Sequence, residues 1–356
     1  MPEIRWLIDA YLDWVAKEGI PVVEDVAVDL FAVETAPWPR LGVNGAFVHT
    51  HSRGDLCSLY VIDLPPGGST LPQRHLYEEV MFVLRGQGSL VVERAGGERR
   101  GFEWGKASMW ALPMNATYRL FNTSGTHGAR IVSVSNLPMV MKQFRNEAFI
   151  FQNEFDFGER WGEERFYRGD GEFTPTREMR HLWESNFIPD TLAFDKLVDS
   201  PSRGKGSRNI QLILGETTMA SHISEVGVGA YKKAHIHWDG THIIQLGDEG
   251  YSLYWRSGDP DFRRVDWKFG MLHSPGNDEW HQHFNVSDRP GRYLPISYGG
   301  YRYPFSKNQR NNINHDYRRK SRIQIEYEDE DPRIRELFDR ERALYAERVK
   351  AATPAR

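Results

Sequence analysis

The chain has 356 residues, of which 40% are hydrophobic and 26% are charged, and its formal net charge is −4. This composition is typical of a globular protein, and so small a net charge gives no general attraction to nucleic acid or to anionic membranes. The single cysteine, Cys57, excludes an intrachain disulfide framework and suits a reducing cytoplasm. The first residues do not resemble a signal peptide, and no apolar run approaches the roughly 20 residues of a membrane span. We therefore expect a cytoplasmic protein that binds neither nucleic acid nor membranes.

The first part of the chain changes from a helical pattern to a strand pattern. Apolar residues recur at helical spacing over residues 3–18, so residues 1–44 are predicted to be a helical N-terminal extension. From 45 to 140, short runs rich in β-branched and aromatic residues alternate with Gly, Pro and Asn. This is the pattern of an antiparallel sandwich or barrel.

The second part of the chain changes from an irregular pattern to strands and then to a helix. Residues 141–208 are less regular and end in the polar stretch DSPSRGKGSR, so they are predicted to be a linker region. Strand texture returns over residues 209–305. Residues 306–356 are a C-terminal extension, with a helix predicted to begin near Pro332.

The two strand-rich segments repeat one spacing of residues. In each segment a glycine stands six positions before a polar residue, and a histidine follows two positions later. The matching pairs are Gly67 and Gly229, Gln73 and His235, His75 and His237, Pro113 and Pro275, Tyr118 and His281, and Asn122 and Asn285. The offset is 162 residues at the start and 163 at the end. A repeat of this length, made of strands, predicts a duplicated β-barrel.

These residues resemble the two motifs of the cupin superfamily. Its first motif runs Gly, five residues, His-x-His, three or four residues, Glu and then Gly; its second contains Pro, His and, four residues later, Asn. The C-terminal copy matches it with His235, His237 and His281, although His242 stands in the slot for Glu and one residue is inserted before His281. The N-terminal copy keeps His75 and Glu79 but has Gln73 and Tyr118 at the other two positions. The resemblance implies an all-β bicupin: two double-stranded β-helix (jelly-roll) barrels with helical extensions at both ends.

The His-x-His spacing has a chemical consequence in a strand. Residues i and i+2 point to the same face, so His235 and His237 would project two imidazoles into one barrel. With His242 and His281 they are the predicted ligands of one divalent transition metal ion per chain. Imidazole accepts Fe(II), Zn, Ni, Mn or Cu, and Fe(II) is favoured here by the family resemblance. A shell of neutral imidazoles leaves the ion its full charge, which favours anionic substrates.

Other histidines leave alternatives open. His283 lies two residues after His281 and could replace it as a ligand or face the substrate. His273 is expected in a loop. The N-terminal copy, with only His75 and Glu79, is expected to be a poor metal site. The segment FVHTHSRGD, which contains His49, His51 and Asp55, also has a His-x-His pattern but lacks the motif glycine.

Side chains that could bind substrate follow from charge and aromatic character. Lys233, or its neighbour Lys232, could neutralise a carboxylate, and Arg302 could bind an anion through two hydrogen bonds. Tyr251 and Trp280 could line an aromatic pocket beside His283. The structural alternatives are exposed lysines at a strand edge and aromatic rings that pack the core.

An all-histidine site resembles the gentisate dioxygenase-like and quercetinase-like bicupins more than the oxalate decarboxylases, which keep the glutamate. The leading hypothesis is therefore a non-haem Fe(II) dioxygenase that acts, with dioxygen, on a small aromatic or enolisable, anionic substrate. One alternative is a non-redox, metal-dependent lyase, isomerase or hydrolase; another is a bicupin that binds a ligand without turnover. Family habit suggests a homodimer or a higher homo-oligomer.

Overall fold

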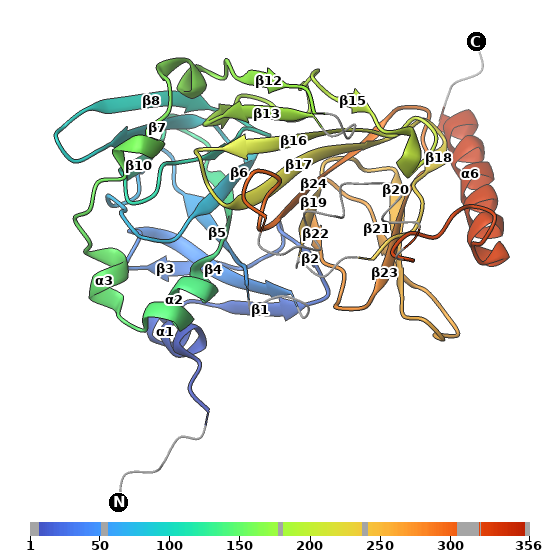
Figure 1. Ribbon diagram of the computed structural model, residues 1–356, viewed down its shortest axis with the longest axis horizontal. Helices are drawn as coiled ribbons and strands as arrows, with labels where there is room; N and C mark the ends of the chain where they lie inside the picture. The colour runs from blue at the N-terminus through green and yellow to red at the C-terminus, as the bar shows by residue number, and fades with distance from the viewer. Residues whose placement is uncertain are drawn as a thin grey trace, which may run out of the picture.

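Two β-barrels, each built from a large and a small sheet, make up most of the structure (Figure 1). The computed structural model describes residues 7–50, 56–176, 181–236, 241–304, 320 and 322–352. The runs of β-branched and aromatic residues become strands, as predicted, because their alternating side chains pack on the two faces of a sheet.

The N-terminal barrel joins an eight-stranded sheet to a three-stranded one. The large sheet contains β1 (Val22–Asp25), β3 (Ala36–Trp38), β4 (Val43–Thr50), β5 (Ser58–Leu64), β6 (Glu79–Arg85), β9 (Met109–Ala111), β11 (Ala129–Ser135) and β14 (Phe187–Ile188). The small sheet contains β7 (Gly88–Glu93), β8 (Arg99–Trp104) and β10 (Thr117–Asn122).

The C-terminal barrel joins a nine-stranded sheet to a four-stranded one. The large sheet contains β2 (Ala27–Asp29), β12 (Glu172–Thr174), β13 (Leu182–Ser185), β15 (Val198–Asp199), β16 (Arg208–Leu214), β17 (Met219–Val226), β19 (His242–Gln245), β22 (Met271–His273) and β24 (Gly291–Tyr298). The small sheet contains β18 (Ala230–Tyr231), β20 (Gly250–Trp255), β21 (Arg263–Asp266) and β23 (Trp280–Asn285).

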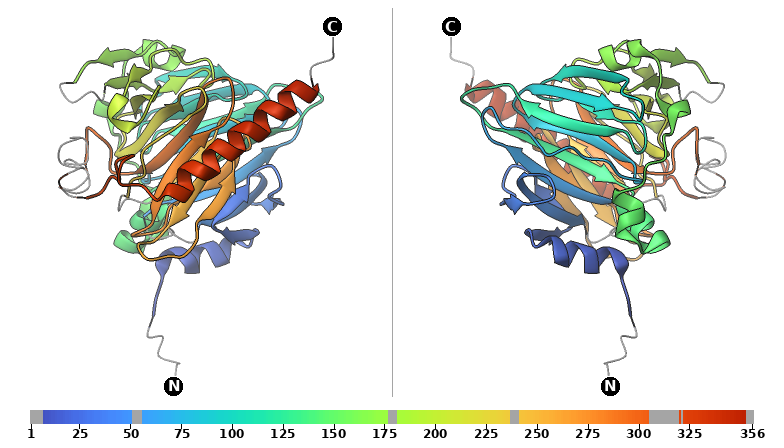
Figure 2. Two further views of the ribbon diagram at one scale, coloured as in Figure 1. Left: turned by 90° about the vertical axis from the view of Figure 1, so that its right-hand side faces the viewer. Right: turned by 90° about the vertical axis from the view of Figure 1, so that its left-hand side faces the viewer.

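Helices lie outside both barrels. Among the described residues they are α1 (Ala10–Glu18), α2 (Leu137–Phe144), α3 (Glu147–Phe151), α6 (Pro332–Ala352) and the 3₁₀ turns Gly158–Arg160, Glu164–Arg168 and Pro201–Arg203. The first helix begins at Ala10, later than predicted, because the Asp9 carboxylate caps the amides of Tyr11 and Leu12. The last helix begins at Pro332, as predicted, and crosses the outer face of the C-terminal barrel (Figure 2). Among the described helices, none combines the length and the apolar character needed to span a bilayer.

Strands are exchanged between the two halves of the chain. Strand β2, from the predicted N-terminal extension, pairs with β22 of the C-terminal barrel. Strand β14, from the predicted linker, pairs with β9 of the N-terminal barrel. The segments 1–44 and 141–208 therefore contribute strands as well as helices and complete the two barrels.

The two large sheets pack face to face. Because side chains alternate between the two faces of each strand, every second residue lies between the sheets. Val80 and Phe82 of β6 share one buried cluster with Ile244 of β19 and Leu294 of β24, so this cluster is the layer between the barrels. Residues of the opposite parity face the barrel interiors. The interior of the N-terminal barrel holds a large apolar and aromatic cluster that includes Trp110.

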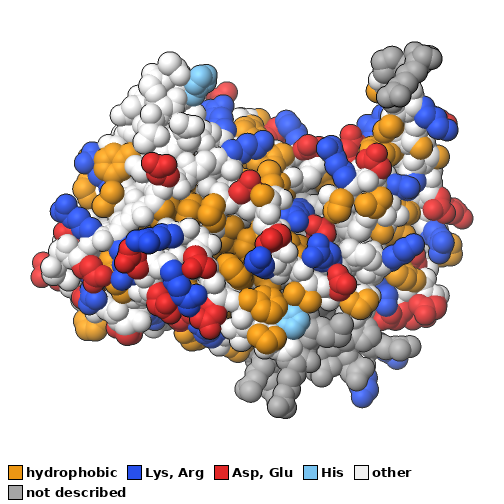
Figure 3. Space-filling view, turned by 90° about the horizontal axis from the view of Figure 1, so that it is seen from above, with side chains coloured by type: hydrophobic (Ala, Val, Ile, Leu, Met, Phe, Trp, Pro, Cys, Tyr) orange, Lys and Arg blue, Asp and Glu red, His pale blue; other side chains and the backbone are white. Residues whose placement is uncertain are grey.

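The interior of the C-terminal barrel has a different composition. Its apolar cluster consists of Val226, Ile243, Trp267 and Tyr293. Several other inward positions carry polar side chains, among them Gln245, Ser252, His273 and His283. On the face of the molecule that Figure 3 shows, by contrast, Lys and Arg side chains are interspersed with Asp and Glu. The concentration of polar groups inside one barrel directs attention to that interior.

Candidate active site

His235 and His281 meet inside the mouth of the C-terminal barrel. The two residues form an antiparallel bridge in which each backbone N–H donates to the other's carbonyl at 3.0 Å. Their imidazole centroids are 4.0 Å apart. His281 is 1% exposed on β23, whereas His235 is half-buried, so the pair lies where the barrel interior approaches solvent.

The third motif histidine, His237, lies outside the described residues. Among the residues that are described, no group of three His, Cys, Asp or Glu side chains is arranged to hold a metal ion. Two neighbouring imidazoles fit part of a transition-metal shell. The described residues therefore supply a pair of candidate ligands, and the prediction for His237 remains a prediction from the sequence.

The register of β19 does not bring His242 to this pair. His242 lies opposite Ile296 on β24, and Ile244 lies opposite Leu294. Ile244, Leu294 and Ile296 all belong to the layer between the barrels. Because alternate residues share a face, His242 lies on that side of the sheet, whereas Ile243 and Gln245 face the interior.

The internal repeat explains this difference. Strand β6 pairs with β11 and β9, and β19 pairs with β24 and β22, so the two strands are equivalent. Val80 and His242, 162 residues apart, occupy equivalent positions that face the layer between the barrels. The residue equivalent to Glu79 is then Thr241, which is buried. The repeat therefore places Thr241, rather than His242, at the position of the motif glutamate.

A network of neutral histidines lies deeper in the barrel. His273 is fully buried on β22 rather than in a loop, and its two ring nitrogens contact the Tyr254 hydroxyl and the Gln245 amide. Burial, assisted by the charge of Arg263, lowers the pKa of His273 to about 3. If the amide donates to Nε2, the proton of His273 is on Nδ1 and is donated to the Tyr254 oxygen.

His283 faces the same interior, which either of its two predicted roles, metal ligand or substrate contact, would need. Its Nδ1 lies 2.8 Å from the Ser252 hydroxyl, and its ring lies 4.2 Å from that of Tyr293. Burial, together with unfavourable electrostatic interactions with His281, His273 and Lys232, holds the pKa of His283 well below its usual value. The ring is therefore neutral at physiological pH.

Lys232, rather than Lys233, carries its positive charge into the barrel. Lys232 is 3% exposed; its ammonium donates to the Ser224 hydroxyl and lies 5.0 Å from the centroid of Tyr293. Lys233, the predicted substrate-binding residue, forms an ion pair with Glu326 instead. Successive residues point to opposite faces of an extended segment, which separates the two lysines.

Three other predicted substrate contacts are not brought to the interior. Tyr251 stacks on Phe284 and packs beneath α6. Trp280 shares the outward face of β23 with Phe284, and its indole N–H donates to Ser257 at 3.2 Å. The guanidinium of Arg302 is paired with Glu184 and Glu216, so its anion-binding capacity is satisfied within the chain.

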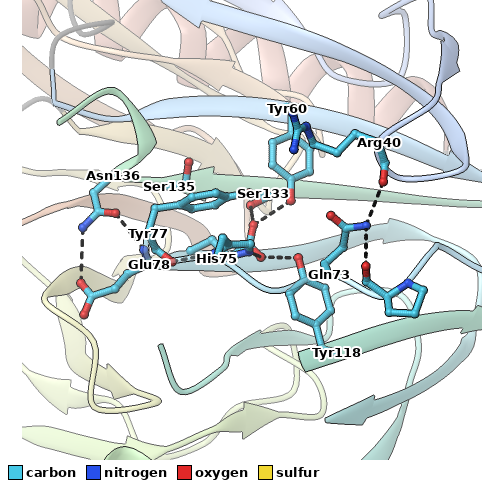
Figure 4. A network of polar contacts seen from close by, with 12 residues as sticks. Arg40, Tyr60, Gln73, His75, Tyr77, Glu78, Tyr118, Ser133, Ser135 and Asn136 are labelled. Atoms are coloured by element: carbon cyan, nitrogen blue, oxygen red, sulfur yellow. Dashed lines mark hydrogen bonds and ion pairs between the residues drawn. The ribbon is translucent and has the colours of Figure 1, made fainter. Parts of the chain in front are cut away.

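The equivalent region of the N-terminal barrel is filled by its own hydrogen bonds (Figure 4). The Glu79 carboxylate accepts from Tyr118 at 2.5 Å and Tyr60 at 2.7 Å. Ser133 donates to it at 2.6 Å, and the His75 ring lies 3.1 Å away. Both oxygens of Glu79 therefore have hydrogen-bond partners, and Figure 4 labels the four side chains that provide them.

The second His-x-His pattern is only partly described. His49 lies on β4, and its Nε2 is 2.8 Å from the Tyr11 hydroxyl of α1. His51 and Asp55 lie outside the described residues.

Sequence reasoning missed Thr241, Tyr254 and Gln245, although counting the repeat offset from Glu79 would have identified Thr241.

Comparisons with known proteins find similar solved structures but no match among family models or curated proteins. No family model matches the chain, and no curated protein matches it. Among solved structures, oxalate decarboxylase from Lactobacillus farciminis in complex with formate aligns with a TM-score of 0.50 and 12% identity, over 81% of this chain and 90% of that one. A variant of the Bacillus subtilis oxalate decarboxylase aligns with a TM-score of 0.49 and 15% identity, over 81% of this chain and 80% of that one. A structure from work on the Mn(II) centres of that enzyme aligns with a TM-score of 0.49 and 14% identity, over 78% of each chain.

At these identities the likeness concerns the fold alone. It confirms the predicted all-β architecture of two cupin barrels. The similar structures named above are oxalate decarboxylases.

Proposed function

We propose that the C-terminal barrel binds one divalent transition metal ion through His235, His237 and His281, and catalyses a non-redox lyase reaction on a small carboxylate. The observation that carries this proposal is the contrast between the two barrel interiors. At equivalent positions the N-terminal barrel has a closed carboxylate network, whereas the C-terminal barrel has paired imidazoles, and its interior also holds the buried ammonium of Lys232.

A metal ion at these imidazoles would act as a Lewis acid that polarises a substrate oxygen. The described residues support this role in part, since His235 and His281 are close together and His281 is buried. His242 is omitted from the proposed ligands because its strand register directs it toward the layer between the barrels.

Lys232 is the residue proposed to recognise the substrate's carboxylate. A cation held in a barrel interior attracts an anion more strongly than it would in water, because the surroundings screen it less. Its contacts with the Ser224 hydroxyl and the Tyr293 ring hold the ammonium in place. The neutral rings of His273 and His283 add no charge that would compete for the substrate.

Tyr254 is the residue proposed to supply a proton. Burial raises its pKa well above the usual value, so the hydroxyl stays protonated at physiological pH. Because its oxygen can accept from His273, its own hydrogen is free to point toward a substrate. The ring of Tyr254 lies 6.1 Å from that of His281, which places the hydroxyl in the same interior as the imidazole pair.

A decarboxylation would be consistent with these groups. The carboxylate leaves as carbon dioxide and one proton replaces it, so no external oxidant is needed. The solved structures of similar fold are named as oxalate decarboxylases, which supports this class as the first to be tested.

A dioxygenase is the second candidate, because one observation favours it. Thr241 occupies the position of Glu79, so the described part of the C-terminal site has no carboxylate ligand, and the all-nitrogen shell resembles that of dioxygenase cupins. Fe(II) would be the ion in that case, and dioxygen the second substrate.

The deciding experiment measures metal content and gas exchange together. Untagged protein and the variant His281→Ala would be analysed for metal and then incubated with a panel of small mono- and dicarboxylates, under argon and in air. We expect about one ion per chain in the wild type, its loss in the variant, and release of carbon dioxide under argon. Oxygen uptake that requires substrate would instead support the dioxygenase. Absence of metal from the folded wild type after reconstitution would refute both.

A further inference from the structure

The chain segment that follows the barrels returns to the candidate site. Residues 323–330, called here the C-terminal strap, run antiparallel to the segment that carries His235. The Ile236 amide donates to the Ile323 carbonyl at 3.1 Å, and the Ile325 amide donates to the Ala234 carbonyl at 3.0 Å. His235 thus forms one bridge to His281 and a second bridge, on its other side, to Gln324.

The N-terminal barrel provides an internal comparison. Gln73, the equivalent of His235, forms a bridge to Tyr118, and this is its only bridge among the described residues. The strap therefore changes the segment around His235 from the edge of a sheet into an interior strand. An edge strand has unpaired backbone groups and more freedom to move, whereas an interior strand is held from both sides.

Buried polar side chains fasten the strap to the same segment. Glu326 pairs with Lys233, and Gln324 accepts a hydrogen bond from Arg203 and donates to Glu326 at 2.9 Å. Gln324 is 5% exposed and Glu326 is 9% exposed. A second fastening lies nearby, where the Tyr327 hydroxyl donates to the Tyr231 carbonyl at 2.6 Å.

We propose that the C-terminal strap positions His235 for metal binding, and that Glu326 is the residue on which this positioning most depends. The inference rests on the proposed metal site. Glu326 acts in two ways: its carboxylate orders the strand through Lys233 and Gln324, and it neutralises an ammonium one residue from Ala234 and two from His235. Without that carboxylate, the Lys233 charge would disfavour a cation at the neighbouring imidazoles.

The test compares Glu326→Gln with Glu249→Gln. Glu249 pairs with Arg348 of α6 at an exposed position, so its variant removes an ion pair from the same barrel without touching the strap. Mn²⁺ affinity would be measured from the free-ion electron paramagnetic resonance signal, and the coordination would be examined from the visible absorption of bound Co²⁺. We expect Glu326→Gln to bind Mn²⁺ at least about tenfold more weakly and to alter the Co²⁺ spectrum, whereas Glu249→Gln resembles the wild type.

A charge reversal separates positioning from a general loss of folding. The double variant Lys233→Glu with Glu326→Lys restores an ion pair of opposite sense and should recover part of the Mn²⁺ affinity that Glu326→Gln loses. Wild-type affinity in a folded Glu326→Gln variant would overturn the inference. If the wild type binds no metal, the proposed function fails, and amide hydrogen exchange over residues 231–236 then tests the role of the strap. Faster exchange in Glu326→Gln than in the wild type supports positioning of this segment by the strap. Unchanged exchange refutes it.

Discussion

The imidazoles of His235 and His281 face each other across an antiparallel bridge, with ring centroids 4.0 Å apart. The same bridge joins Gln73 and Tyr118 in the N-terminal barrel. There, however, the Tyr118 hydroxyl donates to Glu79 at 2.5 Å. One backbone arrangement therefore presents two nitrogen ligands in one barrel and a hydrogen-bonded carboxylate in the other.

Restoring histidine at both N-terminal positions should create a second metal site. In Gln73→His with Tyr118→His, the Glu79 Oε1 loses its tyrosine partner while Tyr60 and Ser133 still hold Oε2. His75 and two new imidazoles would then adjoin a carboxylate oxygen, a ligand set that suits several divalent metals. We expect bound metal to rise by about one ion per chain, measured by elemental analysis after dialysis. Tyr118→His alone is the control, and unchanged stoichiometry in a folded double variant contradicts the prediction.

His242→Val should leave metal binding intact. Valine is the residue that the repeat carries at the equivalent position, Val80, and that position packs in the apolar layer between the barrels. Elemental analysis should show the metal content of the wild type. Loss of the ion in this variant, with folding preserved, would show that His242 is a ligand after all.

Thr241→Glu should strengthen metal binding. It places a carboxylate at the position of Glu79. A negatively charged ligand attracts a divalent cation more strongly than the neutral imidazoles proposed for the wild-type site. Competition with a chromophoric chelator should show affinity increased by about tenfold or more. Equal affinity for the variant and the wild type would argue that Thr241 does not face the ion.

Lys232→Met should weaken substrate binding while the metal remains. Removing a buried charge that contacts an anion costs roughly 1.5–3 kcal/mol, which corresponds to about a 10- to 150-fold increase in KM or Kd. Calorimetric titration with the carboxylates of the panel measures this. Lys232→Arg keeps the charge and should retain part of the affinity, and equal binding by Lys232→Met would place the carboxylate elsewhere.

Tyr254→Phe should slow the reaction more than it weakens binding. The variant keeps the ring beside His281 but removes the hydroxyl proposed to deliver a proton. Loss of a general acid lowers kcat by about 10²–10⁴-fold. Steady-state kinetics on the substrate that the panel identifies would show this as a fall in kcat with little change in KM. A fall in metal content would instead assign Tyr254 a role in holding the site together.

Acid should destabilise the N-terminal barrel through Glu79. Burial alone would raise the pKa of Glu79, but the charge of His75 and the hydrogen bonds from His75, Ser133 and Tyr118 outweigh it and hold the pKa below the usual 4.5. The ionised carboxylate is therefore favoured more by the folded than by the unfolded chain. Its stabilisation is present above the unfolded pKa and is lost as the pH falls through the folded value.

Glu79→Gln tests this dependence. The variant should be less stable than the wild type at neutral pH, and its free energy of unfolding should vary less as the pH is lowered. Urea denaturation at neutral pH and at about pH 4 measures both effects. An equally steep loss of stability in the variant would assign the acid sensitivity to other groups.

Local pattern was sufficient to predict much of this protein. The strand runs, the helix from Pro332 and the repeat of about 160 residues depend on spacing between neighbours in the sequence, which each barrel preserves. The two motifs likewise predicted that His235 and His281 would lie in one barrel, whereas the pairing of His235 with His237 stays a prediction.

The tertiary structure decided which groups actually share the interior. A shift of one residue reverses the face of every side chain in a strand, so the motif's variable gap could not separate His242 from Thr241, or Lys232 from Lys233. Nor could local spacing reveal that Gln324, 89 positions after His235, pairs beside it, or that β2 completes the distant barrel. Such pairings depend on the packing of whole sheets, and the free energy of that packing is distributed over residues far apart in the sequence.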